Sequence, residues 1–275
     1  SDVYKRQYQG ASLFAMARLT EPFEIIRSQR EPREAFDLDQ IIALYDGCVR
    51  CFDDEVRKIF HHLKRCGLDR NTVVAILSDH GMELFEHGTW GQGNSAVGEQ
   101  SNRIPVLIVA PQYAGQGQVD AIIRAQDIAP TLLDCLGIAP SSSMTGVSLR
   151  SFLAGEQSLR DLAATFCTGL WLTRPPGMAA NHLCYPDLSE LLFIPDPQSG
   201  TLVIKPEFRE QIERARDVAI CWRHWKLVRL ALNPRPRYLL FNLAEDPSCH
   251  EDVADRFPEI AGTLRSWLEQ SSKFD

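Results

Sequence analysis

A polar turn at residues 78–81 follows directly after an apolar, β-rich stretch at residues 72–77, and this junction constrains the fold more than any other feature of the chain. The stretch reads Thr-Val-Val-Ala-Ile-Leu and the turn reads Ser-Asp-His-Gly. Ligand-binding groups in open α/β sheets gather where strands end. Asp79 and His80 offer a carboxylate oxygen and an imidazole nitrogen to one divalent cation, and Gly81 lets the backbone bend there. The alternative is that Ser78 or Asp79 caps a helix that follows, with His80 merely exposed.

The sequence after this turn contains further motifs in a recognisable order. Residues 82–94 read Met-Glu-Leu-Phe-Glu-His-Gly-Thr-Trp-Gly-Gln-Gly-Asn, and residues 103–111 read Arg-Ile-Pro-Val-Leu-Ile-Val-Ala-Pro. With the turn, this segment resembles the C-terminal half of the sulfatase family, within the alkaline-phosphatase-like superfamily of metal-dependent sulfate and phosphate ester hydrolases. The resemblance continues in blocks at residues 125–133, 145–149 and 238–247. Together the blocks cover about residues 38–275 in the order of the family.

The expected fold is α/β, with a partial doubly wound sheet of the alkaline-phosphatase type and a small C-terminal antiparallel α+β subdomain. Apolar residues recur at intervals of three and four from Leu38 to Cys66, which predicts a long amphipathic helix that ends at Gly67. Buried strands are expected at 72–77 and 106–110, and a second helix over 127–136.

The chain divides into three expected regions. Residues 1–37 are unassigned, residues 38–160 form the C-terminal part of the α/β core, and residues 161–275 form the C-terminal subdomain. That subdomain contains an irregular, proline-rich insertion at residues 171–206. Short strands over 217–221, 225–230 and 237–242 and a closing helix over 258–270 are predicted after it. In the second strand we expect Lys226 to point outward, beside tryptophans that pack on the sheet.

Composition excludes some partners and leaves the compartment open. The 275 residues carry a formal net charge of -7 without a basic stripe, so the chain has no electrostatic footprint for nucleic acid. An anionic sulfate or phosphate ester would need local help from a metal or from backbone dipoles. No apolar run approaches the roughly 20 residues of a membrane span. The eight cysteines are scattered and neither require nor forbid disulfides.

The resemblance assigns roles to four residues. It implies that Asp79 and His80 are two of the ligands of a divalent metal, calcium in the first place, with manganese, zinc and magnesium as alternatives. His87, on the glycine-rich loop, is expected to donate to an ester oxygen or to protonate the leaving group; its alternative is a structural hydrogen bond. Gln92 stands where many relatives carry a lysine or histidine, and is expected to line the ester pocket without bringing a charge.

Other family elements are not found. The family nucleophile is a cysteine converted to formylglycine within C-x-[PA]-x-R, and of the eight cysteines only Cys66 has an arginine at the right distance, at Arg70. Leu68 occupies the third position of that segment, so no nucleophile is identified. The opening residues 1–7 resemble read-through of a sequencing adapter, and residues 1–37 match nothing. We therefore expect a truncated or artefactual start and a chain that is inactive in isolation.

The function expected from the resemblance is that of a metal-dependent sulfuric ester hydrolase. A phosphodiesterase, a phosphonate hydrolase or a phosphoethanolamine transferase of the same superfamily is the first alternative, because these enzymes share the late motifs. A non-catalytic, sulfatase-like binding protein is the alternative from another class. Asp127 is expected to be structural, as a helix cap or as the partner of Arg124 or Arg103.

Overall fold

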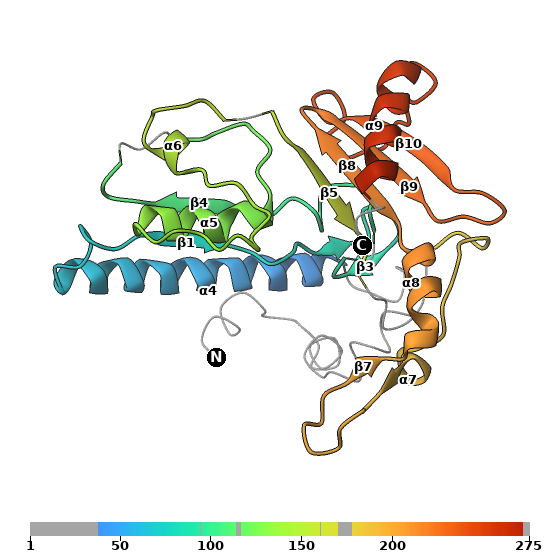
Figure 1. Cartoon of the computed structure of the whole chain (residues 1–275), viewed down its shortest axis with the longest axis horizontal. Coiled ribbons are helices and arrows are strands. Elements are labelled where there is room, and N and C mark those ends of the chain that lie inside the picture. Colours follow the sequence, from blue (N-terminus) through green and yellow to red (C-terminus); the bar gives the residue numbers. More distant parts are fainter. Residues whose placement is uncertain (1–37, 94, 114–116, 160, 170–177, 272–275) are drawn as a thin grey trace.

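The computed structural model describes residues 38–93, 95–113, 117–159, 161–169 and 178–271, and has mixed α/β structure. The unassigned segment 1–37 and part of the proline-rich insertion lie outside the described residues. Figure 1 shows the long helix of residues 38–65 with the strands β1, Val74–Leu77, and β4, Val106–Val109, and the helix α5, Ala125–Cys135. Elsewhere in the molecule a four-stranded sheet carries the C-terminal helix. The predicted α/β class with an antiparallel C-terminal subdomain is confirmed.

The first element is the long helix α4, Leu38–Arg65, the blue helix in Figure 1. It ends where the sequence predicted, because Gly67 adopts a positive φ of 68° that other residues rarely tolerate. His62, Lys64 and Arg65 lie in the last turn, where cations suit the helix dipole. Much of its apolar stripe is exposed, at Ile42, Tyr45, Val49, Phe52 and Ile59.

Two strands follow the helix and form one antiparallel pair. Strand β1, Val74–Leu77, pairs with β4, Val106–Val109, and Leu77 lies opposite Val106. Both strands were predicted, but the expectation that they are buried is wrong for the described part of the chain. Leu77 and Leu107 are 43% and 53% exposed. In the described residues each strand has only the other as a neighbour, which leaves these side chains uncovered.

Helix α5, Ala125–Cys135, is held at its N-terminus by a buried carboxylate. Asp127 accepts hydrogen bonds from the Arg124 side chain at 2.8 and 3.1 Å and from the Val147 backbone at 2.8 Å. Burial raises the pKa of Asp127, but these hydrogen bonds outweigh burial and hold it below its usual value. The predicted structural role of Asp127 is confirmed. The short helix α6, Arg150–Leu153, follows.

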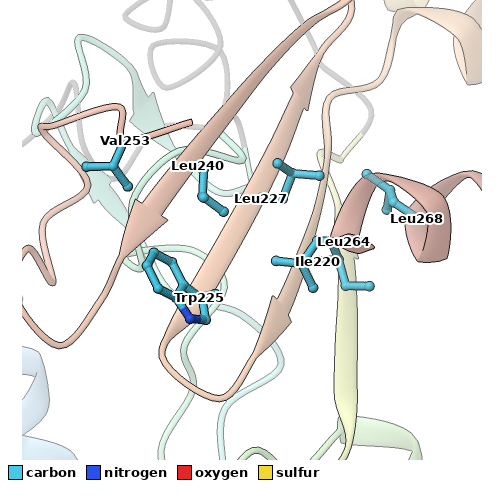
Figure 2. Close-up of a cluster of buried hydrophobic side chains, with 7 residues drawn as sticks. All are labelled: Ile220, Trp225, Leu227, Leu240, Val253, Leu264 and Leu268. Atoms are coloured by element: carbon cyan, nitrogen blue, oxygen red, sulfur yellow. The ribbon is translucent and has the colours of Figure 1, made fainter. Parts of the chain in front are cut away.

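The C-terminal subdomain is built on an antiparallel sheet in the order β10-β9-β8-β5. Its strands are β5, Ala163–Cys167, β8, Val218–Trp222, β9, Trp225–Leu230, and β10, Arg237–Asn242. Helix α9, Pro258–Ser271, covers one face with Leu264 and Leu268. Figure 2 shows these leucines beside Ile220, Leu227 and Leu240 of the sheet. The predicted strands and closing helix are confirmed, and β5 was not predicted.

The other face of this sheet packs on a loop from the N-terminal part of the chain. Ala96, fully buried, joins Ala219, Val228, Phe241 and Cys249 in a second apolar cluster. Because side chains alternate between the faces of a strand, Lys226 lies on the same side as Val228. It is completely buried. The expectation that Lys226 points outward is wrong, since both faces of the sheet are covered.

The segment between β5 and β8, which includes the insertion, contains short elements and one buried ion pair. The elements are α7, Leu188–Leu191, β6, Leu192–Phe193, β7, Val203–Ile204, η2, Pro206–Phe208, and α8, Arg209–Ala215. His182 Nε2 lies 2.8 Å from Asp217 Oδ1, and both residues are 7% exposed. The same oxygen accepts from Ala231 N at 2.7 Å. This pair ties the insertion to the sheet.

In the part of the chain that the structure describes, none of the helices has the length and apolarity needed to cross a bilayer.

Candidate metal centre

The turn at the end of β1 brings together the two predicted metal ligands. His80 N donates to Asp79 Oδ1 at 2.9 Å, and His80 Nε2 lies 3.5 Å from Asp79 Oδ2. Ser78 Oγ donates to the His80 carbonyl at 2.5 Å and closes the turn. The next element is the strand β2, Glu83–Leu84, so the helix-cap alternative for this turn is wrong.

The orientation of the His80 ring leaves one nitrogen available. Nδ1 lies 2.9 Å from the carbonyl oxygen of Gly81. A carbonyl can only accept, so Nδ1 carries the proton, and in the neutral ring Nε2 presents a lone pair. A backbone carbonyl on one ring nitrogen is the usual support of a metal-binding histidine. Nε2 itself lies on the side of Asp79 Oδ2.

Asp79 and His80 are also accessible and electrostatically suited to a cation. The Asp79 side chain is 84% exposed and that of His80 38%. The hydrogen bond from the His80 backbone lowers the pKa of Asp79, so the carboxylate is ionised at neutral pH. Two ligand atoms of one ion with bond lengths of about 2.0–2.6 Å stand roughly 3–3.5 Å apart, and the observed 3.5 Å separation fits.

Gly81 places this turn against a second loop. Its N–H donates to the Ser101 carbonyl at 3.1 Å. A Cβ added at Gly81 would lie 1.7 Å from the Gln100 carbonyl oxygen, far inside any real contact. Glycine is therefore required by the close approach of the two backbones, and the turn rests directly on residues 100–101.

A buried carboxylate that the sequence analysis missed stabilises the same region. Glu83 is 1% exposed, and its Oε1 accepts hydrogen bonds from Ser101 Oγ and from Ser95 N. Ser101 Oγ also accepts from Gly93 N at 3.1 Å. The sequence gives no signal for this network, because a glutamate usually faces solvent and its partners Ser95 and Ser101 are distant in the sequence.

His87 lies at the contact with the C-terminal subdomain. It hydrogen-bonds the Ser248 backbone, and its ring centroid is 5.6 Å from that of His250. Burial, and then the charge of His250, lowers the pKa of His87. Its Nε2 is buried and has no hydrogen-bond partner in the described structure. In the neutral ring this nitrogen is a hydrogen-bond acceptor. To protonate a leaving group, His87 would first have to bind a proton, and its lowered pKa disfavours the protonated ring.

Gln92 has an exposed side chain after strand β3, Trp90–Gly91. Within the described residues, neither Gln92 nor His87 has a hydrogen bond or ion pair with Asp79 or His80. The structure thus brings together two of the four expected site residues. No group of three or more histidine, cysteine, aspartate or glutamate side chains that could hold a metal is found in the part of the chain that the structure describes.

Comparison with known proteins finds a family likeness for about half of the chain. Residues 4–138 match the family described as Sulfatase, so the match reaches into the segment that the sequence analysis left unassigned. The chain is sulfatase-like. Arylsulfatase K of Bos taurus is 24% identical over 233 residues, which are 83% of this chain and 36% of the bovine protein. The chain therefore spans about a third of the length of that relative.

Solved structures give the fold. The phosphonate monoester hydrolase of Agrobacterium radiobacter superposes with a TM-score of 0.64 at 22% identity, over 96% of this chain and 50% of that one. A structure solved in complex with its substrate D-glucosamine-2-N,6-O-disulfate gives a TM-score of 0.62 at 21% identity, over 86% of this chain and 41% of that one. These likenesses confirm the predicted alkaline-phosphatase-like fold of this sulfatase-like chain.

Proposed function

We propose that this chain supplies the Asp79–His80 ligand pair of a metal-dependent sulfuric ester hydrolase. The observation that carries the proposal is the arrangement of the turn after β1. The Gly81 carbonyl holds the proton of His80 on Nδ1, and Nε2 then faces a carboxylate oxygen 3.5 Å away. The carboxylate of Asp79 and the second ring nitrogen of His80 thus lie side by side and accessible to solvent, as two ligands of one ion would.

The donor set is compatible with a divalent cation but does not complete its coordination. Asp79 offers hard oxygen and His80 offers nitrogen, whereas calcium takes about six to eight oxygen ligands. We assign calcium first and keep manganese, zinc and magnesium as alternatives. A bound divalent ion would act as a Lewis acid on an ester oxygen. The residues of this chain hold the ionised carboxylate and the histidine tautomer that such an ion requires.

The choice of a sulfate ester rests on the relatives. Arylsulfatase K and the family match support a sulfate ester, and so does the structural neighbour solved with a disulfated glucosamine. The fold likeness to a phosphonate monoester hydrolase favours the second candidate, hydrolysis of a phosphonate or phosphodiester. Gln92 supports neither, because its amide hydrogen-bonds any ester oxygen without adding charge. His87 stays a candidate for the ester pocket only if the loop that carries it moves, because its Nε2 is buried in this structure.

Metal binding by the isolated chain is the first test. We expect calorimetric titration with calcium, manganese, zinc and magnesium to give weak binding that disappears in Asp79→Ala. Asp69→Ala is the matched control, because Asp69 is an exposed aspartate in the loop before β1. Loss of binding in both variants, or retention in both, would contradict the assignment. We also propose that the isolated chain has no turnover, since it presents two protein ligands in the part described.

The reaction is tested on a longer coding sequence that includes the region preceding these motifs in the relatives. The substrates are 4-nitrophenyl sulfate, bis(4-nitrophenyl) phosphate and a 4-nitrophenyl phosphonate monoester. We expect the sulfate to be preferred and its turnover to be lost in Asp79→Ala and His80→Ala, with Asp69→Ala unaffected. A preference for either phosphorus ester would replace the sulfatase assignment with the second candidate. Metal binding without turnover of any ester would favour the non-catalytic alternative.

A further inference from the structure

Lys226, in the inner strand β9, is a fully buried cation with partners outside its own sheet. Its Nζ donates to the Gly98 carbonyl oxygen and lies 3.0 Å from Glu99 Oε1. The Glu99 side chain is 22% exposed, so the ion pair is largely screened from water. Long charged side chains are rarely buried completely unless they are paired in this way.

The loop that Lys226 holds is organised around the same contact. The Gly98 carbonyl also accepts from Asn102 Nδ2 at 3.1 Å, and the backbone N–H of Arg103 donates to the Glu99 carbonyl at 2.9 Å. Ala96, two residues earlier, is fully buried in the apolar cluster on this face of the sheet. Residues 96–103 are thus fixed to the C-terminal sheet by one apolar and one ionic contact.

The next two residues of this loop support the turn that holds Asp79 and His80. Gln100 and Ser101 supply the two backbone oxygens against which Gly81 rests, one as a steric contact and one as a hydrogen-bond acceptor. Ser101 Oγ in addition donates to Glu83 on the far side of the turn. Residues 98–99 are thus joined to the turn by the backbone of the two residues that follow them and by the contacts of those residues with Gly81 and Glu83.

We infer that Lys226 is a positioning residue for the Asp79–His80 pair. Lys226 acts through Gly98 and Glu99, which fix the position of the loop that Gly81 packs against. It contacts neither the proposed metal ligands nor a substrate. The C-terminal sheet therefore helps to hold the Asp79–His80 pair in position. The inference deepens the proposed function and rests on it for the identity of the site, but the mechanical link from Lys226 to the turn stands on the contacts alone.

The test compares three variants of the 275-residue chain. Lys226→Met keeps much of the length and apolar volume and removes the charge, whereas Lys226→Arg keeps the charge. Leu264→Ala destabilises the same sheet from its opposite face, where Leu264 of α9 is fully buried, and serves as the stability control. Global stability is measured for each by urea unfolding. Local opening is measured by amide hydrogen exchange of peptides covering residues 79–84 and 96–103.

We expect Lys226→Met to speed exchange in both peptides by at least about threefold beyond Leu264→Ala, and Lys226→Arg to restore part of the protection. Manganese affinity, followed by paramagnetic broadening of the Asp79 and His80 amide signals, should fall in Lys226→Met and stay unchanged in Leu264→Ala. Faster exchange confined to residues 96–103, or an equal effect in Leu264→Ala, would overturn the inference.

Two further outcomes separate this inference from the proposed function. If the unaltered chain binds no metal, the proposed ligand pair is wrong, while the exchange data still decide the link from Lys226 to the turn. If Lys226→Met does not fold, Glu99→Gln replaces it. That variant retains a hydrogen-bond acceptor on a partly exposed side chain, and should give the same pattern of exchange with smaller changes; no change in residues 79–84 would refute the link.

Discussion

Replacing Gly81 with alanine adds one methyl group at the tightest backbone contact of the site. The new Cβ would lie 1.7 Å from the Gln100 carbonyl oxygen and 2.8 Å from its carbonyl carbon, whereas ordinary contact begins at 3.4 Å. The backbone of Gly81 does not have the positive φ that would itself disfavour alanine. The destabilisation by alanine therefore comes from the steric clash, which forces the two loops apart.

The expected magnitude follows from two losses and one gain. Overpacking of this kind costs about 1–3 kcal/mol, and separating the loops weakens the hydrogen bond from Gly81 to Ser101, worth about 0.5–1.5 kcal/mol. Alanine lowers the conformational entropy of the unfolded chain, which stabilises the folded state by about 0.4–1 kcal/mol. We expect Gly81→Ala to lower the free energy of unfolding by about 2–3 kcal/mol, and to weaken metal binding by moving Asp79 and His80.

Gly262→Ala is the matched control, because it makes the same chemical change in helix α9. A Cβ there meets nothing within 4 Å, and alanine favours a helix over glycine by about 1 kcal/mol. Urea unfolding followed by tryptophan fluorescence should thus give shifts of opposite sign for the two variants. A loss below about 1 kcal/mol for Gly81→Ala, or metal binding equal to that of the unaltered chain, would refute the reasoning.

Three more outcomes are expected. The pKa of Asp127 in the folded chain lies below its value in the unfolded chain. Its stabilising contribution is therefore present above about pH 4 and is lost as the pH falls through the folded pKa. In Asp127→Asn we expect the acid limb of a curve of unfolding free energy against pH to flatten. His182→Leu leaves Asp217 buried without its partner, and should lower the unfolding free energy by about 3–5 kcal/mol in urea titration. Burial raises the pKa of Cys221 to about 12 and of Cys249 to about 11. Iodoacetamide at pH 8, followed by mass spectrometry, should therefore label these two thiols far more slowly than the exposed cysteines. Rapid labelling of either thiol in the folded chain would contradict the structure.

The sequence predicted those parts of the fold whose signal is local. The apolar period and Gly67 locate α4, and the strands β8, β9 and β10 begin and end within a residue of the predicted ranges. Strand β5 was missed because its five residues have no alternating pattern and are ordered by pairing with β8, some fifty residues later in the chain. The same reason applies to the two-residue strands, which tertiary contacts define.

The site shows the same division. Asp79 and His80 are neighbours in the sequence, so their proximity follows from the turn that joins them. Glu83 and Lys226 could not be found in this way, because each is buried by residues distant in the sequence, Ser101 in one case and Gly98 in the other. Sequence patterns place charged residues in solvent unless a partner is known, and here the partner is known only from the fold.

The contact between residues 96–99 and the C-terminal sheet also limits how this chain can be recombined. A hybrid that joins its first 160 residues to the C-terminal subdomain of a relative would divide the cluster of Ala96, Val228 and Cys249 between two parents. It would also leave Glu99 facing whatever residue replaces Lys226. Crossover designs therefore need to exchange the loop and the sheet as one unit, and paired changes at positions 99 and 226 are the pattern to seek when such hybrids are evolved for activity.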